Sequence, residues 1–296
     1  MKRAAMVVVI LGLAVSAWAQ QATTPQNPPA GQTGTAQTTP PPAPKRLPQA
    51  KTQPEYQAYQ AASKTTDPAA LEAAANDFAT KYPDSELRVL LFKQAMSVYR
   101  TANNGDKMME MGRKVLAIDP DSPEALDGVA EVLVERTHET DLDKTQRWAE
   151  ADKLLQHCLQ TIDTDLVFPL NTPQEKIDAY KSDLRSIVYS FLGTLNSNQE
   201  KFSDAENYYR KAIDAYPSQP DAIVVLRLAL VLDKEGRYAD ALKEADRAME
   251  LMPQQNPGLV ETARGEHDRL VQLTGGIPAS GSTTPANPPA PAAPKN

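Results

Sequence analysis

Residues 185–254 read RSIVYSFLGTLNSNQEKFSDAENYYRKAIDAYPSQPDAIVVLRLALVLDKEGRYADALKEADRAMELMPQ. This stretch contains one pattern of aromatic, apolar and small residues twice, and a proline closes each copy. The first copy has Tyr189, Leu192, Gly193, Phe202, Ala205, Tyr209, Ala212 and Pro217, and the second has Val225, Leu228, Ala229, Tyr238, Ala241, Ala245, Ala248 and Pro253. The two prolines lie 36 residues apart, which is close to the ~34-residue period of a helix-turn-helix repeat. Two such units in tandem predict a helical solenoid.

The repeated pattern resembles that of the tetratricopeptide repeat (TPR) family. Units of that family place a bulky residue, Leu-Gly, Tyr, Ala, an aromatic residue and Pro at fixed spacings. The first copy matches at Tyr189, Leu192, Gly193, Ala205, Tyr209 and Pro217, whereas Asn196 stands where the family has Tyr. Small residues such as Gly193 and Ala229 let two helix backbones approach closely, and larger ones such as Tyr209 and Leu228 fill the space between helices.

Weaker copies of the pattern precede this stretch. Their slots hold Phe92, Ala95, Met96, Tyr99, Met108, Gly112, Val115 and Pro120 in one unit, and Leu126, Val129, Ala130, Leu133, Trp148, Ala151, Leu155 and Cys158 in the next. Residues 67–83 are predicted to hold the second helix of a still earlier hairpin, and a final helix is predicted to start at Asn256-Pro257. No stretch alternates with period two, so the fold class is all-α. We expect residues 53–275 to form a right-handed TPR-like superhelical solenoid of about five helical hairpins plus a C-terminal capping helix.

Both ends of the chain have compositions that do not predict a packed core. Residues 1–19 combine a basic start, an apolar run and Ala17-Trp18-Ala19, which is typical of a secretory signal peptide that is cleaved after Ala19. Residues 20–52 are rich in Pro, Thr and Gln, residues 276–296 are rich in Pro and Ala, and both are predicted to be disordered. The alternative is that these tails cross a peptidoglycan layer or bind a partner. The expected product is periplasmic or secreted, without an integral membrane anchor after signal cleavage.

The charges and the potentially reactive residues argue against several functions. The 31 basic and 38 acidic residues are interleaved, so a nucleic-acid partner is not expected. Cys158 is the only cysteine and is predicted to be a buried packing residue; a catalytic thiol or metal ligand is the alternative, because His157 is adjacent. Asp141-Leu142-Asp143 begins like a calcium loop, but Gln146 occupies the glycine position. We therefore predict no catalytic residue, no metal site and no cofactor.

The resemblance implies a role in protein interaction. TPR solenoids line a concave groove with their first helices, and this groove holds a peptide or a segment of another protein. The groove positions that carry over from the family are Lys93, Ser97, Arg100, Asp127, Glu131, Glu135, Ser190, Thr194, Asn198, Leu226 and Leu230. Their basic, acidic, polar and apolar groups favour an extended ligand of mixed chemistry. They lack the Lys-and-Asn pattern of the family's carboxylate clamps, so capture of a C-terminal carboxylate is not expected.

Two function classes follow from these patterns. The favoured one is an exported scaffold that binds a protein or peptide of the cell envelope, because residues 78–85, FATKYPDS, are similar to those of periplasmic TPR proteins in envelope assembly or organisation. The alternative is an enzyme whose site is built from inserted loops. No acid–base or nucleophile arrangement in the sequence supports that alternative.

One helix is predicted to overshoot the repeat. Thr172-Pro173-Gln174-Glu175 has the pattern of a capping box, and a helix that starts there would begin about twelve residues, or roughly 18 Å, before the first slot of its repeat. Ile177, Tyr180 and Leu184 continue its apolar stripe. We predict that the apolar residues 166–170 pack on this overhang through Phe168. The alternative is an open hydrophobic patch that binds a partner or a second copy of the chain.

Overall fold

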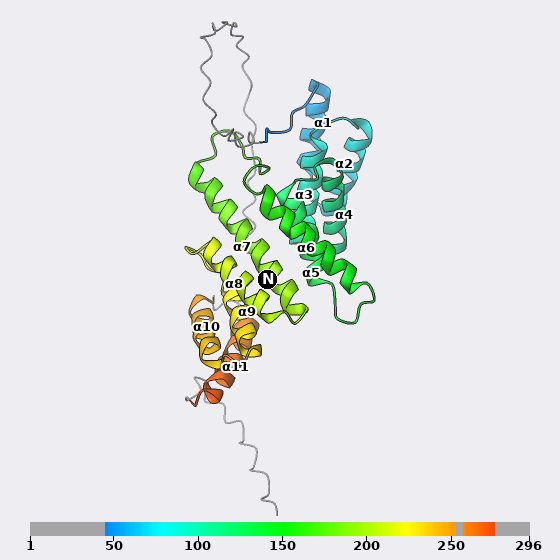
Figure 1. Cartoon of the computed structure of the whole chain (residues 1–296). Helices are drawn as coiled ribbons and strands as arrows, with labels where there is room; N and C mark the ends of the chain where they lie inside the picture. Colours follow the sequence, from blue (N-terminus) through cyan, green and yellow to red (C-terminus); the bar gives the residue numbers. More distant parts are fainter. Residues whose placement is uncertain (1–44, 253–256, 276–296) are drawn as a thin grey trace, which may run out of the picture.

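The computed structural model describes residues 45–252 and 257–275, and over these ranges every regular element is a helix (Figure 1). The eleven described helices are α1 (Gln53–Ser63), α2 (Pro68–Lys81), α3 (Arg88–Thr101), α4 (Gly105–Ile118), α5 (Pro123–Glu135), α6 (Lys144–Thr161), α7 (Gln174–Asn198), α8 (Phe202–Ala215), α9 (Ala222–Lys234), α10 (Tyr238–Leu251) and α11 (Pro257–Leu273). The predicted signal peptide 1–19, most of the predicted linker 20–52 and the predicted tail 276–296 lie outside the described residues. Within the described ranges, no helix combines the length and the apolar character needed to cross a membrane.

The helices stack as a solenoid. Consecutive helices pair as α1/α2, α3/α4, α5/α6, α7/α8 and α9/α10, and α11 packs on α10. The first helices of these hairpins, α1, α3, α5, α7 and α9, also contact one another in order, and α11 extends the series by contacting α9. In Figure 1, the long helix α7 lies between the body of α1–α6 and the group of α8–α11. The predicted all-α solenoid of five hairpins with a final helix is confirmed.

Local sequence explains where several helices begin. Thr52 and Glu55 form a reciprocal capping box at the start of α1, and the side chains of Asp67 and Asn104 accept hydrogen bonds from the first turns of α2 and α4. The predicted capping box at Thr172 is wrong. The Thr172 hydroxyl donates to the carbonyl oxygen of Pro169 at 2.8 Å, so it is used within the preceding turn, and α7 starts at Gln174 without a side-chain cap.

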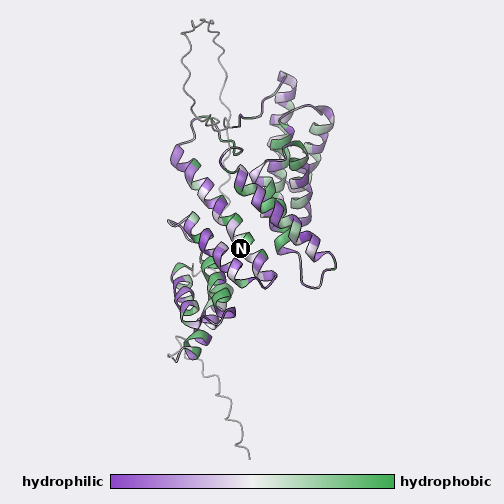
Figure 2. Ribbon diagram, viewed as in Figure 1, coloured by the Kyte–Doolittle hydropathy of each residue, from purple (hydrophilic) through white to green (hydrophobic). Residues whose placement is uncertain are grey.

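The repeat-pattern residues lie where neighbouring helices meet. Fully or almost fully buried are Leu192, Gly193, Ala205, Tyr209, Ala212, Leu228, Ala229, Ala241 and Ala248, and Figure 2 shows apolar residues on the sides of helices that face each other. Gly193 lies very close to the neighbouring helix, because a Cβ atom there would lie 2.6 Å from the ring of Tyr209. Tyr189 is half-buried and stacks on Tyr208, with the ring centroids 6.4 Å apart.

The end of the predicted linker holds defined contacts. The backbone N–H of Lys45 donates to the carbonyl oxygen of Thr164, and its ammonium pairs with Asp119 and Asp165. Arg46 makes two hydrogen bonds to the carboxylate of Glu86. Residues 45–52 therefore lie against the helices, which corrects the prediction that the linker is disordered as far as residue 52.

Candidate functional site

The residues predicted to bind a ligand come from four first helices. We call the surface that they share on α3, α5, α7 and α9 the first-helix face. Ser97, Arg100, Glu135, Asn198 and Leu230 are exposed on it, and Lys93, Glu131 and Thr194 are half-buried. These residues are brought together because α3, α5, α7 and α9 contact one another in order.

Three of the predicted positions are not accessible. Leu226 is 4% exposed and belongs to the apolar core of α8–α11, so the prediction that it faces the groove is wrong. Asp127 and Ser190 are also buried, at 1% and 5% exposure. Their side chains lie between adjacent first helices, where they take part in contacts from helix to helix.

An ion-pair cluster joins α3 to α5. Arg100 bridges two carboxylates of α5, with its Nη2 2.8 Å from Asp127 and 2.6 Å from Glu131. Two turns earlier on α3, Lys93 Nζ lies 2.9 Å from Glu124 Oε2. The sequence predicted Arg100, Asp127 and Glu131 as separate contacts to a ligand, but the structure pairs them with one another. Arg100 and Glu131 still keep accessible surface.

The protonation of this cluster depends on burial. Burial raises the pKa of Glu131 to about 7, although the guanidinium of Arg100 acts in the opposite direction. The nearby carboxylates of Asp127 and Glu135 add to the effect of burial, because like charges disfavour ionisation. Glu131 therefore releases its proton at a higher pH than an exposed glutamate does.

The overhang of α7 lies beside the same cluster. Phe168 and Tyr180 are in edge-to-face contact with their ring centroids 5.7 Å apart, which confirms the predicted packing of the 166–170 segment on α7. Burial raises the pKa of the Tyr180 phenol, and the nearby carboxylates of Glu124 and Asp127 raise it further. Tyr180 and Leu170 nevertheless remain 44% and 86% exposed, so an apolar surface stays open next to the contact.

A second cluster, which we call the Arg227 cluster, joins α9 to α7 and consists of Arg227, Ser190, Thr194 and Tyr209. Arg227 Nη1 lies 3.1 Å from the hydroxyl oxygen of Thr194 and 3.4 Å from that of Ser190. The Tyr209 hydroxyl donates to Thr194 at 3.2 Å. Arg227 was not predicted, although it is the single charge within the apolar run 222–232 and could have been recognised from that contrast.

The residues considered for catalysis do not form a reactive site. Cys158 is fully buried, its thiol donates to the carbonyl oxygen of Pro123, and burial raises the pKa of the thiol, which disfavours the nucleophilic thiolate. His157 contacts Asp121 at 2.8 Å. Within residues 45–252 and 257–275, no three His, Cys, Asp or Glu side chains are grouped so that they could hold a metal ion.

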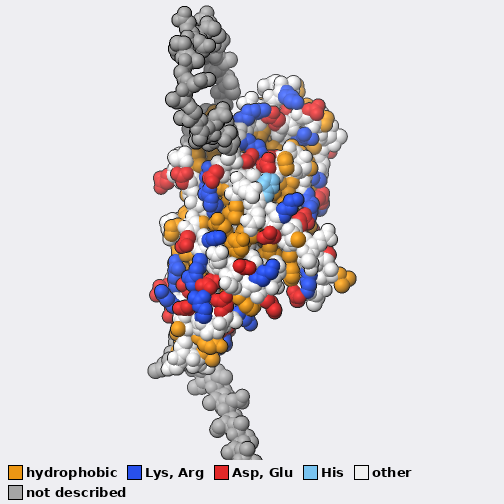
Figure 3. All heavy atoms as spheres, in the orientation of Figure 1, with side chains coloured by type: hydrophobic (Ala, Val, Ile, Leu, Met, Phe, Trp, Pro, Cys, Tyr) orange, Lys and Arg blue, Asp and Glu red, His pale blue; other side chains and the backbone are white. Residues whose placement is uncertain are grey.

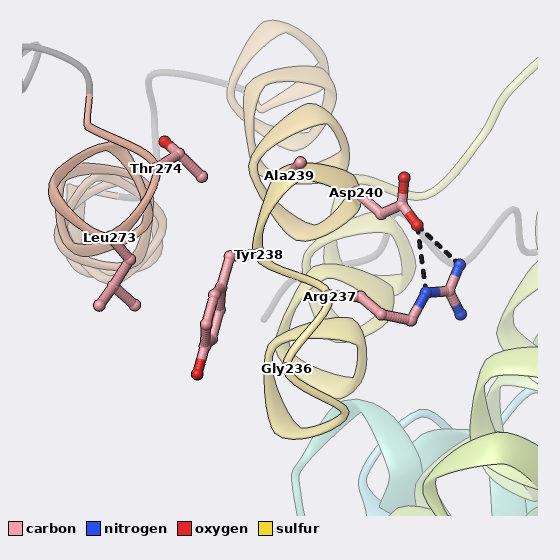
Figure 4. Close-up of a pocket in the computed structure, with 7 residues that line it drawn as sticks. All are labelled: Gly236, Arg237, Tyr238, Ala239, Asp240, Leu273 and Thr274. Atoms are coloured by element: carbon pink, nitrogen blue, oxygen red, sulfur yellow. Dashed lines mark hydrogen bonds and ion pairs between the residues drawn. The ribbon is translucent and has the colours of Figure 1, made fainter.

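A shallow depression lies where the start of α10 meets the end of α11. It has a volume of about 410 Å³, and its lining includes Tyr238, Leu273 and Thr274. Figure 4 shows the guanidinium of Arg237 hydrogen-bonded to Asp240 and turned away from Tyr238 and Leu273.

Charges of both signs are mixed over the visible surface. Figure 3 shows Lys and Arg interspersed with Asp and Glu, with apolar side chains between them. This distribution matches the interleaved sequence with its net charge of −7. It differs from the continuous basic surface with which proteins bind nucleic acids.

Comparisons with known proteins support the repeat assignment. The family model described as a tetratricopeptide repeat matches residues 187–219, which cover the second half of α7 and all of α8. No curated protein matches the sequence significantly. Among solved structures, PilF of Pseudomonas aeruginosa is 19% identical with a TM-score of 0.50, and the match covers 75% of this chain and 84% of PilF.

Two further solved structures are similar at lower scores. PilW, described as a widely conserved type IV pilus biogenesis factor, is 19% identical with a TM-score of 0.49, and the match covers 76% of this chain and 87% of PilW. YrrB, described as a TPR protein with an unusual peptide-binding site, is 14% identical with a TM-score of 0.45, and the match covers 68% of this chain and 84% of YrrB. At these identities the similarity extends to the fold alone.

Proposed function

We propose that this chain, a helical solenoid that carries a tetratricopeptide repeat, is an exported scaffold that binds an extended segment of another protein along its first-helix face. The observation that carries the proposal is the ordered contact of α3, α5, α7 and α9, which places accessible charged, polar and apolar side chains of four helices on one surface. Such a surface offers a long ligand several separate contacts, as interaction sites on stacked repeats do.

Two features of the sequence support export and an envelope partner. Residues 1–19 have the pattern of a signal peptide, and residues 78–85 are similar to those of periplasmic TPR proteins. Mass spectrometry of the chain purified from the organism's envelope or medium should therefore find a mature N-terminus at Gln20. An intact chain that starts at Met1 and stays in the cytoplasm would contradict export.

The first-helix face can be tested separately by photo-crosslinking in the native cell. A photoreactive amino acid would replace Ser97, Glu135, Asn198 or Leu230, which are exposed on the first helices. Matched positions on second helices are Asp152 of α6 and Asp214 of α8, which are also exposed.

The proposal predicts that the same partner protein is recovered from several of the first-helix positions and from neither second-helix position. Recovery from Asp152 and Asp214 alone would place the binding surface on the other side of the solenoid. Among the described residues, no cluster of reactive side chains supports the alternative that the chain is an enzyme.

A further inference from the structure

Arg227 of the Arg227 cluster differs from the other arginines that connect first helices. Arg100 links α3 to two carboxylates of α5, and Arg269 of α11 pairs with Asp233 of α9. Arg227 links α9 to α7 through the hydroxyl groups of Ser190 and Thr194, and no carboxylate of the described residues lies within ion-pair distance of it. Its positive charge is thus half-buried without a counter-ion from the described part of the chain.

The hydrogen bonds of Arg227 leave one edge of its guanidinium open. Both bonds to the described residues come from Nη1, so Nε and Nη2 have no acceptor there. Neither nitrogen is among the buried side-chain atoms that lack a partner, so neither is fully buried. The N–H groups of Nε and Nη2 point in parallel. This edge of an arginine can donate two hydrogen bonds to one carboxylate.

The rest of the cluster fixes the guanidinium in place. Thr194 donates its hydroxyl proton to the carbonyl oxygen of Ser190, and its oxygen accepts from Tyr209 and Arg227, so its hydrogen-bonding capacity is used. Tyr209 is 2% exposed and cannot turn away easily. The orientation of Arg227 is therefore set before a ligand arrives, which reduces the entropy lost on binding.

We infer that Arg227 is the anchor of an anion subsite that takes the carboxylate of an aspartate or glutamate side chain within the bound protein segment. This inference rests on the proposed binding along the first-helix face. A side chain fits better than the end of a chain, because a segment that continues past Arg227 can also contact other accessible positions of the first-helix face, such as Asn198, Leu230 and Arg100. A single carboxylate also balances the single charge of Arg227.

The test uses short peptides of random sequence with amidated C-termini, selected for binding to the full chain after signal removal. Selected peptides are expected to carry Asp or Glu at one fixed position. Replacing that residue by Asn or Gln should weaken binding by about tenfold or more, the usual effect of a lost charge-assisted hydrogen bond. In the Arg227→Gln variant the same replacement should have little effect, because the two changes remove one interaction.

Two further variants keep the test decisive. Arg227→Lys keeps the charge but loses the parallel N–H groups, so it should bind the acidic peptides with intermediate affinity. Arg113→Gln, on the second helix α4, removes the same charge elsewhere and should bind them as the parent does. Thermal unfolding of each variant shows whether it remains folded.

Each remaining outcome is informative. An acidic preference that persists unchanged in Arg227→Gln, or selected peptides without a fixed acidic position, would overturn the subsite while leaving the groove intact. Binding only by a second library with free C-terminal carboxylates would overturn the side-chain assignment. No selection of peptides from either library would contradict the proposed groove itself, and the subsite with it.

Discussion

Phe168 and Tyr180 meet edge to face, with their ring centroids 5.7 Å apart and their planes at 86°. This contact connects the irregular segment after α6 to the part of α7 that extends beyond its repeat. Leu166 and Leu184, from the same two segments, are buried in the core shared by α5, α6 and α7. Phe168 packs against this core, so the joint between the two halves of the solenoid is continuous with it.

We expect Phe168→Ala to lower the free energy of unfolding by about 1 to 2 kcal/mol, because Phe168 is half-buried and the aromatic pair adds to the apolar area that it buries. Thermal unfolding followed by circular dichroism measures the change. Leu170→Ala is the matched control, since Leu170 lies in the same segment but is 86% exposed, and it should change stability by less than about 0.5 kcal/mol. Equal effects of the two variants would mean that the Phe168 contact does not stabilise the joint.

Two glycine substitutions should have opposite effects on stability. In Gly193→Ala the new Cβ would lie 2.6 Å from the buried ring of Tyr209, so Tyr209 must move, at a cost of roughly 1 to 3 kcal/mol. In Gly265→Ala the new Cβ meets no atom within 4 Å on α11, and the better helix propensity of alanine should stabilise the chain by up to about 1 kcal/mol. Thermal unfolding of both variants tests the close packing of α7 and α8, and a stable Gly193→Ala would contradict it.

The sequence predicts the stacking of helices well because the repeat depends on side-chain size at fixed spacings. Small residues such as Gly193 and Ala205 are needed wherever two helices cross, so the period of the pattern is visible in the sequence itself. The contacts of Lys45 could not be predicted in this way. Its ion-pair partners Asp119 and Asp165 lie 74 and 120 residues further along the chain, and no local pattern relates such positions.

The candidate site was predicted less well because a helix turns by about 100° per residue. A shift of one residue along the helix therefore points to a different side. The predicted Leu226 is buried, whereas its neighbour Arg227 reaches Thr194 and Ser190. Arg227 is the single charge in the run 222–232 and marks one side of α9, but the family pattern places Leu226 in the groove, and the groove positions were carried over from that pattern and not from the charge. The pairing of Arg100 with Asp127 was also missed, because a residue type does not reveal whether its partner is a ligand or the neighbouring helix.

The raised pKa of Glu131 predicts a specific pH dependence of stability. The folded chain holds a proton on Glu131 up to about pH 7, whereas an unfolded glutamate releases it near pH 4.3. Between these values the folded state binds more protons than the unfolded state, so Glu131 makes the fold progressively less stable as the pH rises from about 4.3 to 7. The loss should be on the order of 1 to 3 kcal/mol at pH 8.

Glu131→Gln removes this titration, and the comparison of the variant with the parent isolates it from other ionisable groups. The stability of Glu131→Gln relative to the parent should rise from pH 4.5 to pH 8, as measured by chemical denaturation at each pH. Glu135→Gln is the control, because Glu135 is exposed one turn further along α5, and its difference from the parent should change less over the same range. A Glu131→Gln variant whose relative stability falls with rising pH would show that the ion pair with Arg100 outweighs the cost of burying the carboxylate, and that Glu131 stays ionised in the folded chain.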